Sequence, residues 1–227
     1  MAGRATLCLI TDRRRLAGRF GASLDRASSL VARQIEGAVA AGVELVQLRE
    51  RDLSARDLVA LARLLATITH GTTTRLLVND RIDVALVAAA GGSHLRADSP
   101  PPPTIRALVP SGWVVSCAVH SEAAVQRARG ADVLVAGTLF STPSKPHDGT
   151  LLGLDGLTRV VQAAGAVPVL AVGGITAATA AGIKRAGAAG VAAIGAFLPE
   201  PSGDLAGSVQ QQAILLRLAF DSADRAP

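Results

Sequence analysis

The feature that most constrains the fold is a regular alternation of short, almost wholly apolar runs with longer segments of helical periodicity. The apolar runs lack polar–apolar alternation, which is typical of strands covered on both faces in a parallel sheet. Eight runs are present, at residues 6–12, 44–50, 75–80, 93–96, 113–119, 132–138, 167–173 and 190–197. Helical segments are expected near 24–40, 54–69, 81–90, 103–109, 121–129, 153–164, 176–186 and 204–220.

Eight strand–helix units predict an α/β protein with a (β/α)8 TIM-barrel fold. We expect one domain over residues 1–227, with its core at about 6–220, because no linker interrupts the pattern. A doubly wound open sheet is the alternative, but no early strand is followed by a GxGxxG fingerprint. Ser54, Ser121 and Thr176 are expected to cap the helices that follow them.

The composition limits the classes of function. With 49% apolar and 18% charged residues, the chain is expected to fold. The net charge is +5, but the arginines are scattered and only four Phe and one Trp are present. This pattern favours a small anionic ligand and argues against nucleic acid. Two cysteines in apolar runs, no signal sequence and no transmembrane stretch predict a cytoplasmic protein without a membrane partner. The oligomeric state stays open, and a homo-oligomer is compatible with the sequence.

Polar side chains end the apolar runs, where a barrel of this kind places its active site. Gln47, Arg49 and Arg51 stand at alternate positions, so they are expected to share one direction. Unpaired guanidinium groups are costly to bury, which favours an anion clamp. Two alternatives remain open: Arg49 pairs internally with Glu50 or Asp80, or Asn79 and Asp80 only cap a helix. The further candidates at strand ends are His94, Arg96, Asp98, His120, Thr142, Ser144, Lys145, Gly174, Ile194 and Gly195.

Two anion sites are expected from these residues. The loop Thr142-Pro143-Ser144-Lys145 offers hydroxyls, amides and one of only two lysines. Gly174 and Gly195 follow the last two strands, where backbone amides commonly bind phosphate. No histidine or cysteine spacing indicates zinc, whereas carboxylates at Asp80 and Asp98 could hold Mg²⁺.

A series of motifs along residues 8–197 occurs in the same order as in a known family. They are LITD (9–12), VQLRERD (46–52), VNDRIDVAL (78–86), GGSHLRAD (91–98), AVHSEAA (118–124), ADVLVAGTLFSTPSK (131–145), GLDGL (153–157), AVGGIT (171–176) and AGAAGVAAIGAF (186–197). Together they resemble the thiamine-phosphate synthase and thiazole tautomerase (TenI-like) superfamily, whose members are (β/α)8 barrels.

For a synthase, the resemblance implies that an aminopyrimidine diphosphate is joined to a thiazole phosphate and that diphosphate leaves. Asp80 would bind Mg²⁺. Arg49 and Lys145 would be catalytic, with charge placed where the leaving group becomes negative. The implied substrate-binding residues are Gln47, Arg51 and Asn79 for the pyrimidine diphosphate, Thr142 and Ser144 for the thiazole partner and leaving diphosphate, and Gly174, Ile194 and Gly195 for the thiazole phosphate. Arg96 is a further substrate-binding candidate.

The chain departs from the synthase pattern at several positions. Arg51 replaces a Lys and Arg96 replaces a Gly, while Ser99 stands where the second magnesium carboxylate is expected, with Asp98 one residue earlier. An altered magnesium site is therefore predicted. Two alternatives to a synthase stay open. One is a thiazole tautomerase in which His120 is the acid and base, and the other is a non-catalytic barrel that binds thiazole or thiamine phosphate. The synthase leads because the diphosphate clamp is almost complete.

Overall fold

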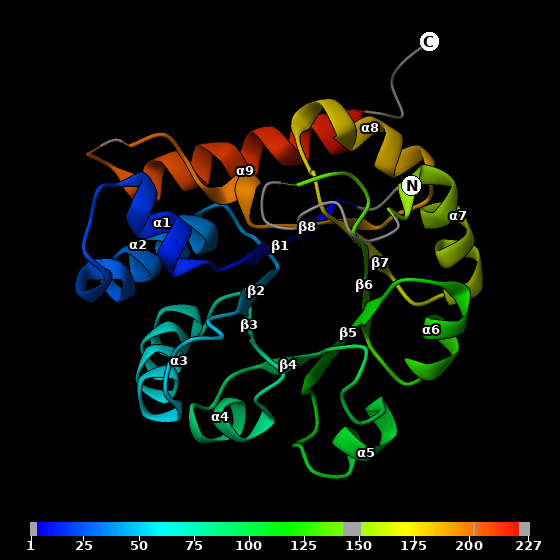
Figure 1. Cartoon of the computed structure of the whole chain (residues 1–227), viewed down its shortest axis with the longest axis horizontal. Coiled ribbons are helices and arrows are strands. Elements are labelled where there is room, and N and C mark those ends of the chain that lie inside the picture. Colours follow the sequence, from blue (N-terminus) through cyan, green and yellow to red (C-terminus); the bar gives the residue numbers. More distant parts are fainter. Residues whose placement is uncertain (1–3, 143–150, 202, 223–227) are drawn as a thin grey trace.

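Eight parallel strands form a closed barrel in chain order, with β8 returning to pair with β1 (Figure 1). The computed structural model describes residues 4–142, 151–201 and 203–222. The barrel confirms the predicted (β/α)8 fold and excludes the open sheet. The strands are β1 (Thr6–Ile10), β2 (Leu45–Leu48), β3 (Arg75–Asn79), β4 (Gly92–Leu95), β5 (Val114–Val119), β6 (Val133–Gly137), β7 (Val169–Val172) and β8 (Gly190–Ala193).

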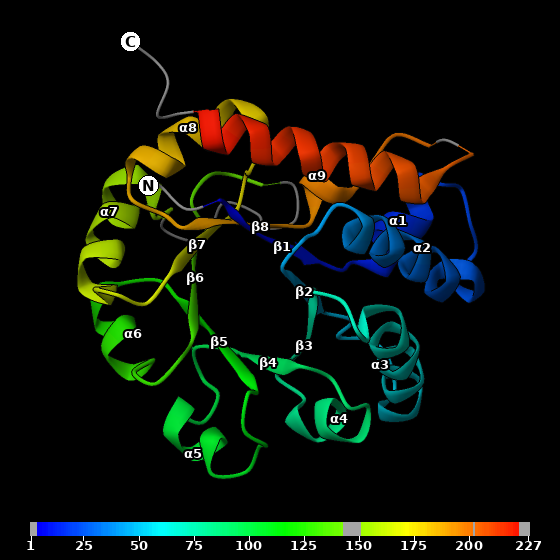
Figure 2. The same cartoon turned by 180° about the vertical axis from the view of Figure 1, so that it is seen from behind.

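Helices surround the barrel on its outside, as both views show (Figures 1 and 2). The long final helix packs against α2 and α8 beside β1 and β8, and so covers the junction of the first and last strands. The helices are α1 (Arg13–Arg19), α2 (Ala27–Ala40), α3 (Ala55–Thr69), α4 (Ile82–Val87), α5 (Pro102–Arg106), α6 (Glu122–Arg127), α7 (Gly153–Ala164), α8 (Ala177–Arg185) and α9 (Leu205–Asp221), with short 3-10 helices η1 (Leu24–Arg26) and η2 (Gly195–Phe197).

The apolar core has two parts because every strand is covered on both faces. A small cluster fills the barrel and includes Cys8, Ile10, Leu77 and Leu170. A larger cluster lies between the strands and the surrounding helices. This arrangement explains why the strands appear in the sequence as continuous apolar runs. Among the described residues, no helix is long and apolar enough to cross a membrane.

The predicted helix starts are confirmed where a side chain caps the helix. Ser54, Ser121 and Thr176 each accept a hydrogen bond from a backbone N–H in the first turn that follows. Helix α1 was not predicted, because its three arginines at the start suggested a charge cluster. Asp12 caps it by accepting from the Arg15 backbone N–H at 3.1 Å.

Candidate functional site

A layer of polar side chains crosses the barrel near the carboxyl ends of four consecutive strands. Gln47 on β2 donates from Nε2 to Oδ1 of Asn79 on β3 at 2.8 Å. Nδ1 of His94 on β4 lies 3.0 Å from the hydroxyl oxygen of Ser116 on β5. Strand alternation points these side chains inward, since Leu95 beside His94 belongs to the outer core. The structure thus brings the predicted site residues Gln47 and Asn79 together, whereas Ser116 was missed within its apolar run.

Arg49 and Arg51 follow directly after β2 and lie beside this polar layer. They border a cavity of about 290 Å³, together with Asp12, Arg14, Glu50 and Asp52. Within the described part of the chain, neither guanidinium has a carboxylate partner within ion-pair distance. The alternative in which Arg49 pairs with Glu50 or Asp80 is therefore wrong.

Burial and charge make Arg49 an electrostatically unusual cation. Burial, and then the neighbouring Arg51, lower the pKa of the Arg49 guanidinium, while Asp12 and Glu50 oppose that change. A partly buried cation facing a second cation is costly unless an anion comes to lie between them. The pair therefore has the electrostatic character of an anion site. Burial, with added repulsion from Arg49, lowers the pKa of His94 to about 4, so this imidazole is neutral at physiological pH.

A buried carboxylate supports the loop that carries the two arginines. Glu50 accepts hydrogen bonds from the Arg13 backbone N–H at 3.0 and 3.2 Å, and so joins the start of α1 to the end of β2. The hydroxyl of Thr11 accepts from the Arg49 backbone N–H at 2.9 Å. Burial raises the pKa of Glu50 to about 7, although hydrogen bonds from the Thr11 side chain and the Arg13 backbone lower it. Thr11 and Glu50 are strand-end residues too, but only the folded chain shows that they hold the loop.

A second cavity of about 200 Å³ lies beside the first, between the ends of β2, β3 and β4. Arg51, Arg81 and Arg96 line it, and so do Asn79 and Asp80. Asp80 has a φ of +62°, a conformation uncommon outside glycine. Neither Asn79 nor Asp80 caps α4, because Arg81 occupies the cap position without a side-chain bond. The helix-cap alternative for these two residues is therefore wrong.

The expected magnesium ligands Asp80 and Asp98 are engaged by the chain itself. The Arg96 guanidinium lies 3.3 Å from Asp80 and is also hydrogen-bonded to Asp98. Ser99 donates its hydroxyl to the other Asp80 oxygen. Across the described residues, no group of three or more His, Cys, Asp or Glu side chains forms a metal site. Mg²⁺ requires open oxygen ligands in octahedral geometry, so this donor set does not fit the ion.

Among the described residues, two glycine-containing turns, after β7 and β8, border the far side of the barrel mouth. Gly174 has a φ of +68°, and a Cβ there would lie 2.6 Å from Phe140 Cβ. Only glycine therefore fits this turn after β7. Ile194 and Gly195 lead from β8 into η2, and open space surrounds Gly195. Exposed amides at this position suit the predicted phosphate site, although no hydrogen bond to a ligand tests it.

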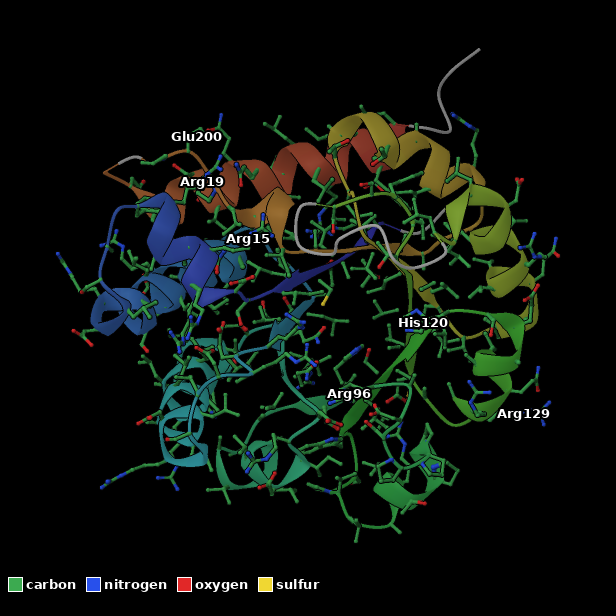
Figure 3. The ribbon with its side chains drawn as sticks, viewed as in Figure 1. Arg15, Arg19, Arg96, His120, Arg129 and Glu200 are labelled. Atoms are coloured by element: carbon green, nitrogen blue, oxygen red, sulfur yellow. The ribbon has the colours of Figure 1, made fainter. Side chains whose placement is uncertain are left out.

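His120 lies at the end of β5, where the sequence predicts it, and is exposed. Its Nδ1 is hydrogen-bonded to the Gly137 carbonyl oxygen on β6. Because a carbonyl oxygen can only accept, Nδ1 carries a proton and neutral His120 would present Nε2 as an acceptor. Figure 3 shows His120 and Arg96 over the ring of strands, with Arg129 at the outer edge beyond α6. Thr142 is half-buried after β6, and the predicted residues Ser144 and Lys145 lie outside the described residues.

These features define a (β/α)8-barrel protein with a cationic, amide-bordered site at the carboxyl ends of its strands, a site suited to phosphorylated small molecules. A family model described as thiamine monophosphate synthase matches residues 7–197. The chain belongs to this family.

Relatives and solved structures agree with this assignment. The thiamine-phosphate synthase of Solidesulfovibrio magneticus is 41% identical over 166 residues, which cover 72% of this chain and 74% of the relative. That of Roseiflexus castenholzii is 39% identical over 173 residues, covering 75% and 71%. The structure of thiamine phosphate pyrophosphorylase from Pyrococcus furiosus superimposes with a TM-score of 0.74 at 26% identity, and covers 95% of this chain and 97% of its own.

Proposed function

We propose that this chain is a transferase of thiamine biosynthesis, which joins an aminopyrimidine diphosphate to a thiazole phosphate and releases diphosphate. Family membership and the named synthases at 39–41% identity support this activity. No comparison favours the thiazole tautomerase or the non-catalytic phosphate-binding barrel. The observation that carries the proposal is the Arg49–Arg51 pair beside the cavity of about 290 Å³, without a carboxylate partner in the described chain. Two buried free cysteines are compatible with a reducing compartment, so we place the enzyme in the cytoplasm.

In the proposed reaction, the bond between the pyrimidine methylene carbon and a diphosphate oxygen breaks. Both electrons leave with the oxygen, and the thiazole nitrogen then donates its lone pair to the resulting carbocation. Arg49 and Arg51 would neutralise the negative charge that develops on the leaving diphosphate. Their position before the reaction begins supports this role, because cations already in place need no reorganisation during bond cleavage.

The other proposed contacts divide between the two sides of the barrel mouth. Gln47 and Asn79 would orient the pyrimidine, since each amide keeps hydrogen-bonding capacity beyond their mutual bond. Amides at Gly174 and at Ile194–Gly195 would hold the thiazole phosphate. Thr142, with Ser144 and Lys145, would contact the thiazole partner and the departing diphosphate. The magnesium expected from the resemblance enters no step, because the Asp80 and Asp98 carboxylates are engaged by Arg96.

The direct test supplies purified protein with both substrates, with and without Mg²⁺, and measures released diphosphate and thiamine phosphate formed. We expect both products in equal amounts. Arg49→Ala is expected to lower kcat/KM by about 10²–10³-fold, the usual effect of removing one donor to a developing anion. Arg129→Ala is the matched control, because this exposed arginine lies away from the site.

His120→Ala separates the synthase from the tautomerase. Synthase turnover is expected to stay within about threefold of the wild type, because no proton transfer is needed to form the carbon–nitrogen bond. Absence of diphosphate release by the wild type under every condition would refute the proposed function. Conversion of a thiazole carboxylate phosphate that His120→Ala alone abolishes would assign the tautomerase instead.

A further inference from the structure

Arg96 holds a position between two carboxylates at the edge of the second cavity. Its two terminal nitrogens bind different carboxylates, with Nη1 3.3 Å from Asp80 and Nη2 bonded to Asp98. The side chain is 43% exposed and borders the cavity of about 200 Å³. A guanidinium has five N–H donors, so donors remain for a ligand in this cavity.

Ser99 completes the arrangement around Asp80. Its hydroxyl accepts from the Arg96 backbone N–H at 2.9 Å and donates to Asp80 Oδ1. Both oxygens of Asp80 therefore have partners within the chain, one from Arg96 and one from Ser99. A divalent cation that approached Asp80 would have to displace both donors and lie beside a guanidinium of the same sign.

The surrounding charges are those of a diphosphate subsite without a metal. Arg51 and Arg81 line the same cavity as Arg96, together with the acidic residues Glu50 and Asp80, and planar guanidinium groups bind phosphate oxygens in pairs. Arg81 is hydrogen-bonded to Asp83 outside the cavity lining, whereas Arg51 has no ion-pair partner in the described chain. The cavity thus already contains cationic charge where a metal would supply it.

We propose that Arg96 takes the place of the divalent cation in this chain, so that the Asp80–Arg96–Asp98 bridge binds diphosphate directly and no metal ion is needed to hold it. The inference rests on the proposed function for the identity of the natural ligand only. It predicts two properties that can be measured without turnover. Inorganic diphosphate binds in the absence of metal, and removal of the Arg96 side chain opens a cation site between the two carboxylates.

The first experiment titrates inorganic diphosphate into the full-length protein in excess EDTA, by calorimetry. The wild type is expected to bind, and Arg96→Gly is expected to bind at least tenfold more weakly. Arg129→Gly, the same change at an exposed arginine away from the cavity, is expected to match the wild type. Loss of wild-type binding in EDTA, with recovery on addition of Mg²⁺, would overturn the proposal.

The second experiment follows bound Mn²⁺, used alone as a probe, by electron paramagnetic resonance. Wild type and Arg129→Gly are expected to bind none at the site, Arg96→Gly to gain one ion, and Arg96→Gly with Asp80→Asn to lose it again. A wild-type Mn²⁺ ion that Asp80→Asn removes would overturn the proposal, as would a folded Arg96→Gly variant that gains no ion. The wild-type measurements test the proposal even if the Arg96→Gly variant fails to fold. Metal-free diphosphate binding without synthase turnover would refute the proposed function and leave this inference standing.

Discussion

Glu50 is a buried acid whose proton is bound more tightly in the folded chain than in the unfolded chain. Its pKa is raised from 4.5 to about 7, so the folded state carries the extra proton between these pH values. The free energy of unfolding therefore falls as pH rises through this window, by up to about 3 kcal/mol. Urea unfolding at pH 5 and pH 8 measures the effect: the change in the free energy of unfolding from pH 5 to pH 8 is expected to be more positive in Glu50→Gln than in the wild type, because the Glu50 contribution is removed. An unchanged dependence on pH in the variant would contradict the raised pKa.

His94 has the opposite dependence on pH. Its pKa falls from 6.5 to about 4 in the folded chain, so the unfolded state binds the extra proton between these values. Its stabilising contribution is present above about pH 6.5 and is lost as pH falls toward 4. Nuclear magnetic resonance of the ring should show one imidazole that is still neutral at pH 5, and His94→Gln should remove that signal. Titration of the His94 ring near pH 6.5 would contradict the lowered pKa.

The two residues offset one another over the pH range that they share. Between about pH 4.5 and 6.5, Glu50 lowers the free energy of unfolding with rising pH and His94 raises it. Replacing either residue alone should therefore reveal the dependence that belongs to the other. The sequence suggests neither shift, because both depend on neighbours distant in the chain.

Among the helices, α8 begins with a reciprocal pair of caps. The Thr176 hydroxyl accepts from the Thr179 N–H at 3.3 Å, and the Thr179 hydroxyl accepts from the Thr176 N–H at 3.0 Å. Thr176→Ala is expected to lower the free energy of unfolding by about 1 kcal/mol, measured by urea unfolding. Thr104→Ala, at an exposed helical position in α5, is the control and should change it by less than about 0.5 kcal/mol. Equal effects of the two changes would argue against the cap.

Helix starts with local caps could be predicted from the sequence, whereas boundaries that depend on tertiary contacts could not. Ser54, Ser121 and Thr176 each accept from a backbone N–H three positions away, so the signal is local. Helix α1 depends partly on distant groups, since Arg13 lies buried against Asp52 at 2.7 Å. The apolar runs predicted eight strands but extended beyond several of them, because they took in polar or glycine residues of the following turns, such as Asp12 and Gly173.

At the scale of the whole molecule, α9 fastens the amino-terminal end of the barrel. Arg217 binds Glu44 at 2.7 Å and the carbonyl oxygens of Ala5 and Gly42 at 2.8 and 2.9 Å. Asp221 also accepts from the Ala5 N–H at 3.0 Å. These bonds join the last helix to β1 and to the loop before β2, and so hold the two ends of the chain together.

Arg217→Met is expected to lower the free energy of unfolding by about 3 kcal/mol, because it removes the buried guanidinium that pairs with Glu44 and binds two carbonyl oxygens. Urea unfolding provides the measurement. Arg185→Met, an exposed arginine at the end of α8, should change the value by less than about 0.5 kcal/mol. A loss of similar size in both variants would mean that the Arg217 contacts stabilise the fold no more than an exposed arginine does.

Part of the candidate site could be predicted from the rule that active sites of such barrels lie at the carboxyl ends of the strands. That rule gathers strand-end residues at one mouth, so Arg49, Arg51 and Asn79 could be brought together without coordinates. The partners of each side chain could not be predicted in the same way. That Arg96 bridges Asp80 and Asp98 depends on the turn after β4 and on Ser99, and no spacing in the sequence encodes it.

The inward layer of hydrogen-bonding side chains belongs to β2–β5, while backbone around Gly174 and Gly195 forms the opposite rim. The two sides of the barrel mouth therefore differ in the groups that they offer to a ligand. Selectivity for the heterocycle can be altered by exchanging amide or imidazole side chains on β2–β5, whereas the main-chain amides around Gly174 and Gly195 cannot be replaced directly by substitution. Laboratory evolution toward new heterocycles should accordingly accumulate changes among the side chains at the ends of β2–β5.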